Sequence, residues 1–342
     1  MEFTTRHQLQ TLVKKYQRSP DDSTEAKIDS VDSTFPVVLS EYLMQRLEVE
    51  FLPEIAKQFL PCCSELLDHN GAGAFFDDEI EISETVFQKY PNRCIIYTTS
   101  QCYANCRYCS RKERWSHRLS YSKYNFDNAI FRIRTLPEIE EVLLTGGDIF
   151  ANSIEDLEYM LQSLSQIQHV KIIRLATRAF TTNPSILTDE LCSLLSSYNN
   201  IIMCTQFNHS SEFSPQTIAA LLKIQKLGIP ILNQSVLLSG VNDSTPALRD
   251  LLTACAANRV IPYYLFHCFK VKGVQHFRTS PLLGERLIAS LAGQVGGWWL
   301  PRYVLIPHTT GIKIPICLNG VIENSKSALL LRDFTGREIR YD

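Results

Sequence analysis

From residue 89 onward the chain alternates between two kinds of segment, and this alternation restricts the fold more than any other feature. Short runs rich in valine, isoleucine and leucine recur, and stretches with amphipathic periodicity separate most of them. Continuously apolar strands that alternate with amphipathic helices are typical of parallel βα units, because such strands are covered on both faces. The apolar runs are residues 93–99, 141–145, 170–177, 201–206, 229–238, 260–267 and 302–307, and the helical stretches include residues 153–167, 184–197 and 214–228.

These segments predict an α/β protein built as a partial or full (βα) barrel of parallel strands with an N-terminal helical extension. About six or seven units over roughly 220 residues fit such a barrel. A doubly wound open sheet has the same strand rhythm and is the alternative. We interpret residues 1–88 as a helical lead-in, residues 89–316 as the barrel and residues 317–342 as a C-terminal tail.

Charge and hydropathy exclude several classes of protein. The chain has 34 basic and 36 acidic side chains and a net charge of −2, so we expect no nucleic-acid partner. No apolar run is long enough for a membrane helix, so we expect no membrane partner. The N-terminus lacks the apolar core of a signal peptide, which favours the cytoplasm, although its basic, mildly amphipathic character leaves a transit peptide as an alternative.

Three of the eleven cysteines are clustered, at Cys102, Cys106 and Cys109 in a C-x3-C-x2-C spacing. The remaining cysteines are scattered, mostly in apolar segments, as is typical of buried reduced thiols. Structural zinc takes four closed ligands; here no second pair follows, although His117 or another cysteine could be the fourth ligand. A [4Fe–4S] cluster held by three thiolates instead keeps one iron open to an outside ligand, and this is the favoured interpretation.

Distinctive polar residues follow four successive predicted strands. In a barrel the loops after the strands meet at one face and carry the chemistry. The three-cysteine loop follows the first strand, and we therefore expect an active site at this face. The residues after the next three strands are Gly146, Gly147 and Asp148; Thr177 and Arg178; and Phe207, Asn208 and His209.

The cysteine spacing, with the aromatic Tyr108 before the last cysteine, resembles the signature of the radical S-adenosylmethionine (SAM) enzymes. In that superfamily SAM binds the open iron, and an electron from the cluster generates a carbon radical. The segment LLTGGD resembles their second motif, in which Gly146, Gly147 and Asp148 would hold the methionine end of SAM.

Further segments narrow the resemblance to the lysine 2,3-aminomutase family. They occur in the family's order across the predicted barrel: YPNRC, CYANCRYCSRK, LLTGGD, TRAFTTNPSILTDEL, QFNH, NQSVLLSGVND, PYYLFH and GVQHFRT. The resemblance implies an isomerase that uses a [4Fe–4S] cluster, SAM and pyridoxal phosphate. In this family pyridoxal phosphate holds the substrate amine, a SAM-derived radical removes a hydrogen from the β-carbon, and the nitrogen migrates from the α-carbon to the β-carbon.

The resemblance also implies roles for individual residues. The family's Schiff-base lysine matches Lys313, although His308, Thr309 and Thr310 replace its glycine run and only Gly311 is kept. The other matches are Lys89 and Arg93 for the pyridoxal phosphate group, Arg111 for the substrate carboxylate, and Tyr108, Gln206 and Gln234 for SAM, with Gln206 itself a departure from a family histidine.

The substrate pocket departs from the family pattern. The lysine-using members bind the distal ammonium of lysine with two aspartates, and Phe269 and Ile306 stand in their places. A buried ammonium without a counter-ion is costly, so we expect lysine to be a poor substrate. Lys270, with Lys272 and His267 beside it, would suit an acidic side chain if one of them turned inward.

The resulting hypothesis is a 2,3-aminomutase acting on a free neutral or aliphatic α-amino acid. The alternatives are a glutamate 2,3-aminomutase, a modifier of a protein lysine, an enzyme of this lineage with a changed reaction, and a non-enzymatic zinc protein. The expected partners are the small-molecule substrate and an electron donor such as flavodoxin or ferredoxin. The family's intersubunit zinc is not expected, because Ser244 follows GVND and residues 319–342 contain no cysteine. A homodimer of another kind stays open.

Overall fold

The computed structural model describes residues 6–16, 25–68, 80–83, 85–116, 120–307, 311–317, 321–324, 329–332 and 337–341. Its main sheet has ten strands in the order β1 to β10. Strands β3 to β9 run parallel, and β1, β2 and β10 add antiparallel edges. The strands are β1 (Ile80–Ser83), β2 (Val86–Tyr90), β3 (Arg93–Thr99), β4 (Glu141–Gly146), β5 (Ile172–Ala176), β6 (Ile201–Thr205), β7 (Ile231–Leu237), β8 (Ile261–His267), β9 (Arg302–Leu305) and β10 (Ile314–Pro315).

This strand order distinguishes between the two predicted architectures. Each parallel strand lies beside the next one in the sequence, so the strand order never reverses, as it would in a doubly wound sheet. Within the described residues β1 and β10 end the sheet without pairing to each other. The prediction of a parallel (βα) barrel is therefore confirmed, in its partial form.

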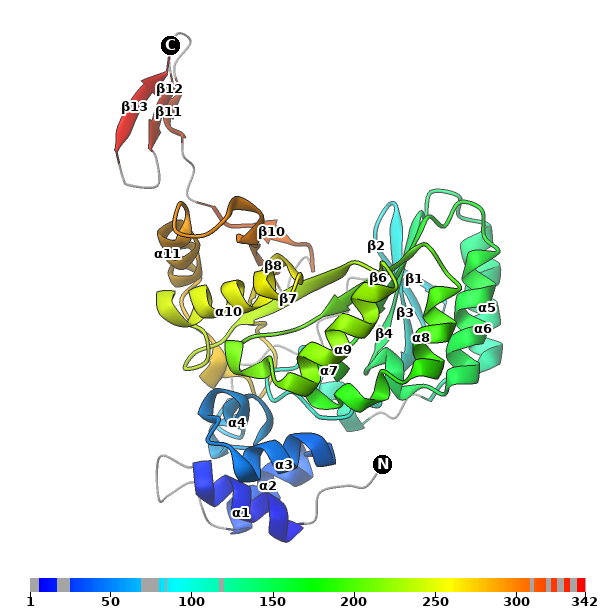
Figure 1. Ribbon diagram of the computed structural model, residues 1–342, viewed down its shortest axis with the longest axis horizontal. Helices are drawn as coiled ribbons and strands as arrows, with labels where there is room; N and C mark the ends of the chain where they lie inside the picture. The colour runs from blue at the N-terminus through cyan, green and yellow to red at the C-terminus, as the bar shows by residue number, and fades with distance from the viewer. Residues whose placement is uncertain are drawn as a thin grey trace.

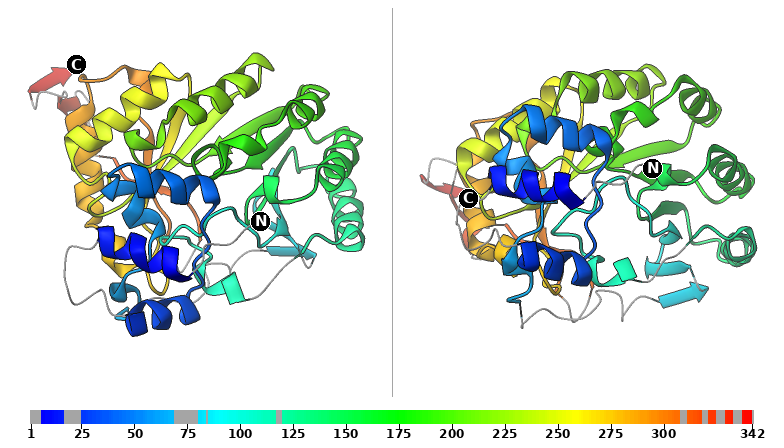
Figure 2. Two further views of the ribbon diagram at one scale, coloured as in Figure 1. Left: turned by 60° about the horizontal axis from the view of Figure 1, so that its bottom comes forward. Right: turned by 90° about the horizontal axis from the view of Figure 1, so that it is seen from below.

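Helices cover the outer face of the curved sheet (Figure 2). They are α5 (Lys123–Arg134), α6 (Ile154–Ser165), α8 (Asp189–Ser196), α9 (Pro215–Lys226), α10 (Thr245–Ala257) and α11 (Pro281–Leu291), whereas the short α7 (Ala179–Thr182) lies after β5 near α3. In α6 the Ser153 side chain caps the helix by accepting a hydrogen bond from the Asp156 amide. Leu157, Leu161 and Leu164 recur at helical spacing and are buried against the sheet.

Side chains alternate along the strands between this outer core and the barrel interior. In β5, Ile173 and Leu175 are buried in the core beneath the helices. Ala176 faces the other way and lines an interior cavity. The alternation follows from the two-residue period of a strand, and it gives the interior its own set of side chains.

Four N-terminal helices lie together at one end of the sheet (Figure 1). They are α1 (Arg6–Tyr16), α2 (Glu25–Thr34), α3 (Glu41–Val49) and α4 (Pro53–Phe59). Helix α4 ends at Phe59, because Pro61 follows, and Cys63–Glu65 form a separate 3-10 turn.

The described segments also locate the expected domain limits. The sheet begins at Ile80, so the limit expected between residues 88 and 89 falls inside β2. The expected C-terminal tail contains a separate antiparallel sheet of β11 (Val321–Asn324), β12 (Leu329–Arg332) and β13 (Glu338–Tyr341), drawn apart from the barrel in Figure 1. No helix in the described part of the chain is long and apolar enough to span a bilayer.

Candidate active site

The three-cysteine loop connects β3 to α5 at the carboxyl ends of the parallel strands. Cys102, Cys106 and Cys109 all line one cavity of about 320 Å³, a volume in the range of small-molecule sites. The N-terminal helical region fixes the loop from the outside. The Asn105 amide donates to the Val38 carbonyl (2.9 Å) and the Arg107 amide to the Gln58 carbonyl (2.7 Å).

A fully buried ionic cluster supports the loop from beneath. The Arg107 guanidinium donates to both carboxylate oxygens of Glu65, at 3.0 and 2.6 Å, and the Lys112 ammonium also contacts this carboxylate. Burial opposes the charge of Glu65, but the two cations outweigh it and lower the pKa of this carboxyl. Burial lowers the pKa of Lys112 to about 8. Glu65 thus joins the N-terminal region to the cysteine loop.

The three thiols of the loop share one cavity and affect one another's ionisation. Burial raises the pKa of Cys102 and of Cys109, and the neighbouring cysteine sulfurs raise both further. Ionisation of Cys102 and Cys109 therefore needs positive charge nearby, which iron bound at this loop would supply. Within the described residues no group of three or more histidine, cysteine or acidic side chains is arranged to hold a single metal ion. His117 lies outside the described residues.

Two glycines let the end of β4 approach the cysteine loop closely. A Cβ on Gly146, whose φ is +128°, would lie 2.2 Å from the Thr99 carbonyl oxygen. A Cβ on Gly147 would lie 1.9 Å from the Gln101 carbonyl oxygen. Only glycine fits such contacts. The cavity is therefore lined here by the bare backbone of Gly146 and Gly147.

Asp148 lines the same cavity, but protein donors already bind its carboxylate. Oδ1 accepts hydrogen bonds from the Phe150 amide (3.1 Å) and the Thr177 hydroxyl (2.8 Å), and Oδ2 accepts from the Arg178 amide (2.7 Å). Burial raises the pKa of Asp148, and these bonds act against that rise. The carboxylate therefore fixes the loops after β4 and β5 relative to each other.

Lys313 reaches the cavity from the segment after β9. Its amide donates to the Tyr90 hydroxyl (3.0 Å), and its Nζ lies 5.2 Å from the centroid of the Tyr90 ring and 5.7 Å from that of Tyr264. Gly311 also lines the cavity, with φ +62°, whereas His308, Thr309 and Thr310 lie outside the described residues. Aromatic faces around an amine suit the planar ring of pyridoxal phosphate.

The expected phosphate ligands lie at the edge of this region. The Arg93 guanidinium carbon stands 4.0 Å from the Tyr90 ring centroid, on the same ring that Lys313 contacts. Arg93 is not among the residues that line the cavity. The side chain of Lys89 lies outside the described part of the chain. Sequence reasoning did not single out Tyr90. Its ring contacts both Arg93 and Lys313.

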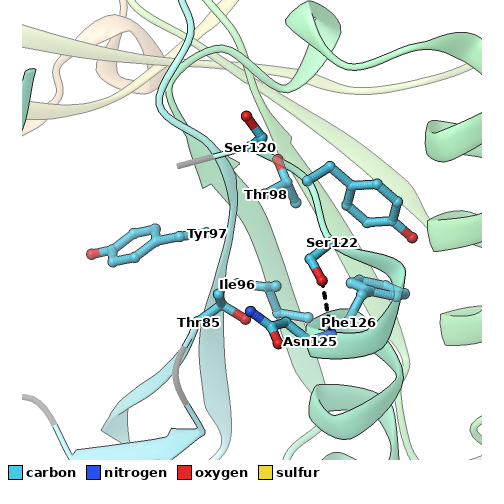
Figure 3. Close-up of a pocket in the computed structure, with 9 residues that line it drawn as sticks. Thr85, Ile96, Tyr97, Thr98, Ser120, Ser122, Asn125 and Phe126 are labelled. Carbon is cyan, nitrogen blue, oxygen red and sulfur yellow. Dashed lines mark hydrogen bonds between the residues drawn. The ribbon is translucent and has the colours of Figure 1, made fainter. Parts of the chain in front are cut away.

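Arg111 enters the cavity beside Tyr97, and its guanidinium carbon lies 4.2 Å from the Tyr97 ring centroid. The Arg111 guanidinium also donates to the Gly146 carbonyl. In Figure 3 the Tyr97 ring points away from Ile96 and Thr98, and all three residues line a second cavity between β3 and α5. That cavity measures about 10 Å³, room for one water molecule, so it is not a substrate site.

The expected SAM and side-chain residues mostly meet in the main cavity. Gln206, Gln234, Phe269 and Ile306 all line it. Lys270 is exposed and does not. Tyr108 is buried behind the loop, where its hydroxyl accepts a hydrogen bond from the Asn208 amide group (2.5 Å).

Comparison with known proteins identifies the family. A family model described as the Radical SAM superfamily matches residues 96–252. The L-lysine 2,3-aminomutase of Methanococcus maripaludis is 34% identical over 92% of this chain and 74% of that protein. The L-lysine 2,3-aminomutase of Acetoanaerobium sticklandii is 32% identical, over 99% and 83%. The glutamate 2,3-aminomutase of Clostridioides difficile is 31% identical, over 92% and 75%.

These matches extend over nearly the whole chain, and they agree with a cavity in which three thiols, a glycine wall and a lysine meet. The chain belongs to the lysine 2,3-aminomutase family of radical SAM isomerases, with a [4Fe–4S] cluster, SAM and pyridoxal phosphate as its cofactors.

Proposed function

We propose that this chain is a 2,3-aminomutase that moves the α-amino group of a free neutral or aliphatic α-amino acid to the β-carbon. The observation that carries the proposal is the lining of the cavity. Phe269 and Ile306 replace the two expected ammonium-binding aspartates, and both line the cavity. Asp148 is the single carboxylate among the described lining residues, and its oxygens are occupied by protein donors.

An ammonium group at the end of a lysine side chain would find no counter-ion in this pocket. Removing such a charge from water without pairing it costs several kcal/mol. A neutral side chain has no such cost and gains from contact with Phe269, Ile306 and the neighbouring Phe266.

The other residues receive roles from their place in the cavity. Cys102, Cys106 and Cys109 hold the cluster, and Gly146, Gly147, Gln206 and Gln234 form the SAM side, with Asp148 fixing their loops. Lys313 holds pyridoxal phosphate, with Arg93 and Lys89 near its phosphate. Arg111 binds the substrate carboxylate, because a guanidinium fork matches two carboxylate oxygens. When bound, the cofactors supply a carbon radical and an electron-accepting ring that carries the migrating amine.

Glutamate is the second candidate, and the three basic residues close to Phe269 in the sequence argue against it. Lys270 and Lys272 are exposed and do not line the cavity. His267 is buried, its Nδ1 lies 2.9 Å from the Tyr303 hydroxyl, and burial lowers its pKa to about 4. Neither an exposed lysine nor a neutral histidine offers a buried positive charge to a γ-carboxylate.

The reaction needs a one-electron donor, for which a flavodoxin or ferredoxin is suited. We place the enzyme in the cytoplasm, where such donors and reduced thiols occur. A homodimer is compatible with this proposal, which does not depend on it.

The first experiment is an anaerobic substrate screen. The reconstituted enzyme is given reductant, SAM, pyridoxal phosphate and a pool of α-amino acids, and β-amino isomers and 5′-deoxyadenosine are measured by chiral mass spectrometry. A single neutral β-amino acid is the expected product. β-Lysine or β-glutamate as the main product would contradict the assigned pocket.

Two variants with matched controls test the cofactor roles. Cys106→Ala should lose the iron, the sulfide and all SAM cleavage, whereas Cys192→Ala on α8 should retain them. Lys313→Ala should keep the cluster but lose the visible absorbance of bound pyridoxal phosphate, and Lys171→Ala on the surface should keep both. SAM cleavage by Cys106→Ala, or an unchanged spectrum in Lys313→Ala, would contradict the assignment.

A further inference from the structure

A buried arginine after β5 is hydrogen-bonded to the middle cysteine of the loop. The Arg178 guanidinium donates through Nη1 to the Cys106 sulfur at 2.7 Å. Arg178 is only 8% exposed, and it lines the cavity that the three cysteines share. The contact places a permanent positive charge beside one of the three sulfurs.

The guanidinium is fixed in place from its other side. Nη2 donates to the Gln58 side-chain oxygen at 2.6 Å and to Glu212 Oε2 at 3.2 Å. The guanidinium carbon lies 4.5 Å from the centroid of the Phe59 ring. Gln58 and Phe59 belong to α4, so the N-terminal helices take part in holding this charge.

Glu212 is held in turn, so its charge is also fixed. Its Oε1 accepts from the amides of Asn208 (2.8 Å) and His209 (3.0 Å), and its Oε2 accepts from the Thr181 hydroxyl (2.8 Å). The Gln58 oxygen also accepts from the Asn208 side chain (3.0 Å). Gln58, Arg178, Thr181, Asn208 and Glu212 are all buried, and the network ends at the half-buried cluster ligand Cys106.

We propose that Arg178 is a positioning residue that sets the reduction potential of the cluster, with Glu212 opposing it. The proposal depends on Cys106 being a cluster ligand, as assigned in the proposed function. Reduction adds one electron from the external donor, and the cluster becomes more negative. An N–H donor and a positive charge at a ligand sulfur stabilise the reduced form, so they raise the potential. A carboxylate behind the guanidinium cancels part of that field.

The proposal predicts shifts of opposite sign for the two partners. Arg178→Gln removes the charge, so the midpoint potential should become more negative. Glu212→Gln keeps an oxygen acceptor but removes the opposing charge, so the potential should become less negative. Arg178→Lys keeps the charge and should shift the potential less than Arg178→Gln does. A purely structural role would not give two signs.

The test is an electron paramagnetic resonance redox titration of the reconstituted full-length protein without SAM or substrate. The ion pair Arg46–Glu50 supplies the control, because Arg46 is also 8% exposed and its Nε lies 2.9 Å from Glu50. Arg46→Gln and Glu50→Gln should leave the potential unchanged. Iron and sulfide are measured in every variant.

Several results would overturn the inference. They are an unchanged potential in Arg178→Gln with full iron content, or shifts of the same sign for Arg178→Gln and Glu212→Gln. If Arg178→Gln does not assemble a cluster, an unchanged potential in Glu212→Gln and Arg178→Lys overturns it. Full cluster content in Cys106→Ala would instead refute the ligand assignment, which separates the failure of the proposed function from that of this inference.

Discussion

At the scale of single residues, a close backbone approach in the active site depends on Gly147. The Asp148 amide donates to the Gln101 carbonyl at 2.8 Å, which draws the end of β4 against the start of the cysteine loop. No side chain larger than hydrogen fits between these two backbones.

Gly147→Ala should therefore displace the cysteine loop. The added methyl group would lie 1.9 Å from the Gln101 oxygen, and overpacking of this kind costs about 1–3 kcal/mol of unfolding free energy. We expect a lower denaturation midpoint and a lower iron content after reconstitution. Gly297→Ala is the control, since no heavy atom lies within 4 Å of its Cβ. Wild-type stability and iron content in Gly147→Ala would show that the loop yields without cost.

His267 makes the stability of the barrel depend on pH. Burial lowers its pKa from 6.5 to about 4, so the unfolded chain binds more protons than the folded chain between these values. Stability is therefore retained above pH 6.5 and falls as the pH drops toward 4, by up to about 3 kcal/mol from this group.

His267→Asn should reduce this acid sensitivity, because asparagine does not titrate and still offers an acceptor to Tyr303. The measurement is urea unfolding of wild type and variant at several values between pH 7 and 4. As the pH falls, the unfolding free energy of the wild type should decrease more than that of His267→Asn. His7→Asn, an exposed position in α1, is the control. Parallel curves for wild type and His267→Asn would count against this account.

Sequence spacing revealed the residues whose partners are close along the chain. The three cysteines and the Gly146–Gly147 pair each lie within a few positions of one another, so a local pattern identifies them. Gln58 bonds Arg178 and Glu212 across 120 and 154 positions. No periodicity or motif encodes such a contact, and only the folded chain brings the three together.

At the scale of elements, helices were predictable where periodicity and capping agree. Ser153 before α6 and Ser214 before α9 both accept a hydrogen bond from the first helical turn. The role of the N-terminal helices was not predictable, because nothing in their sequence indicates what they cover. Their region contributes Glu65 to the cysteine loop and Gln58 to Arg178.

Glu65→Gln should weaken the attachment of the N-terminal region to the loop. The change leaves the buried Arg107 and Lys112 without their counter-ion, and loss of one partner of a buried ionic group costs about 3–5 kcal/mol. We expect a lower unfolding free energy and faster proteolysis near the cysteine loop. Glu48→Gln, at an exposed position in α3, should leave both unchanged. Equal protease sensitivity in the two variants would show that the ionic cluster does not hold the loop.

At the scale of the whole molecule, the rhythm of strands and helices predicted parallel units but not how far the sheet closes. Closure depends on twist and on what pairs at the edges, and both are properties of the assembled sheet. Here β2 and β10 pair antiparallel at the two sides of the parallel strands. Lys313 lies directly before β10, at this edge of the sheet, and from there it lines the cavity.

The proposed substrate pocket also exists only at this scale, because Phe269 follows β8 and Ile306 follows β9. Both belong to one apolar cluster with Phe266 and Val304. In the proposed pocket a substrate side chain would contact residues from two barrel units at once, so we expect a change of specificity to need substitutions at both positions.

The double variant Phe269→Asp, Ile306→Asp should admit lysine. Two carboxylates would pair with the lysine ammonium and remove a penalty of several kcal/mol, and each 1.4 kcal/mol corresponds to about tenfold. We expect kcat/KM for lysine to rise at least about tenfold and kcat/KM for the neutral substrate to fall. Phe269→Asn with Ile306→Asn is the matched control, because it adds polarity without charge. Iron content and pyridoxal phosphate absorbance should match wild type in both variants. Wild-type turnover of lysine equal to that of the aspartate variant would refute the assigned pocket, because the two apolar side chains would then not exclude the ammonium.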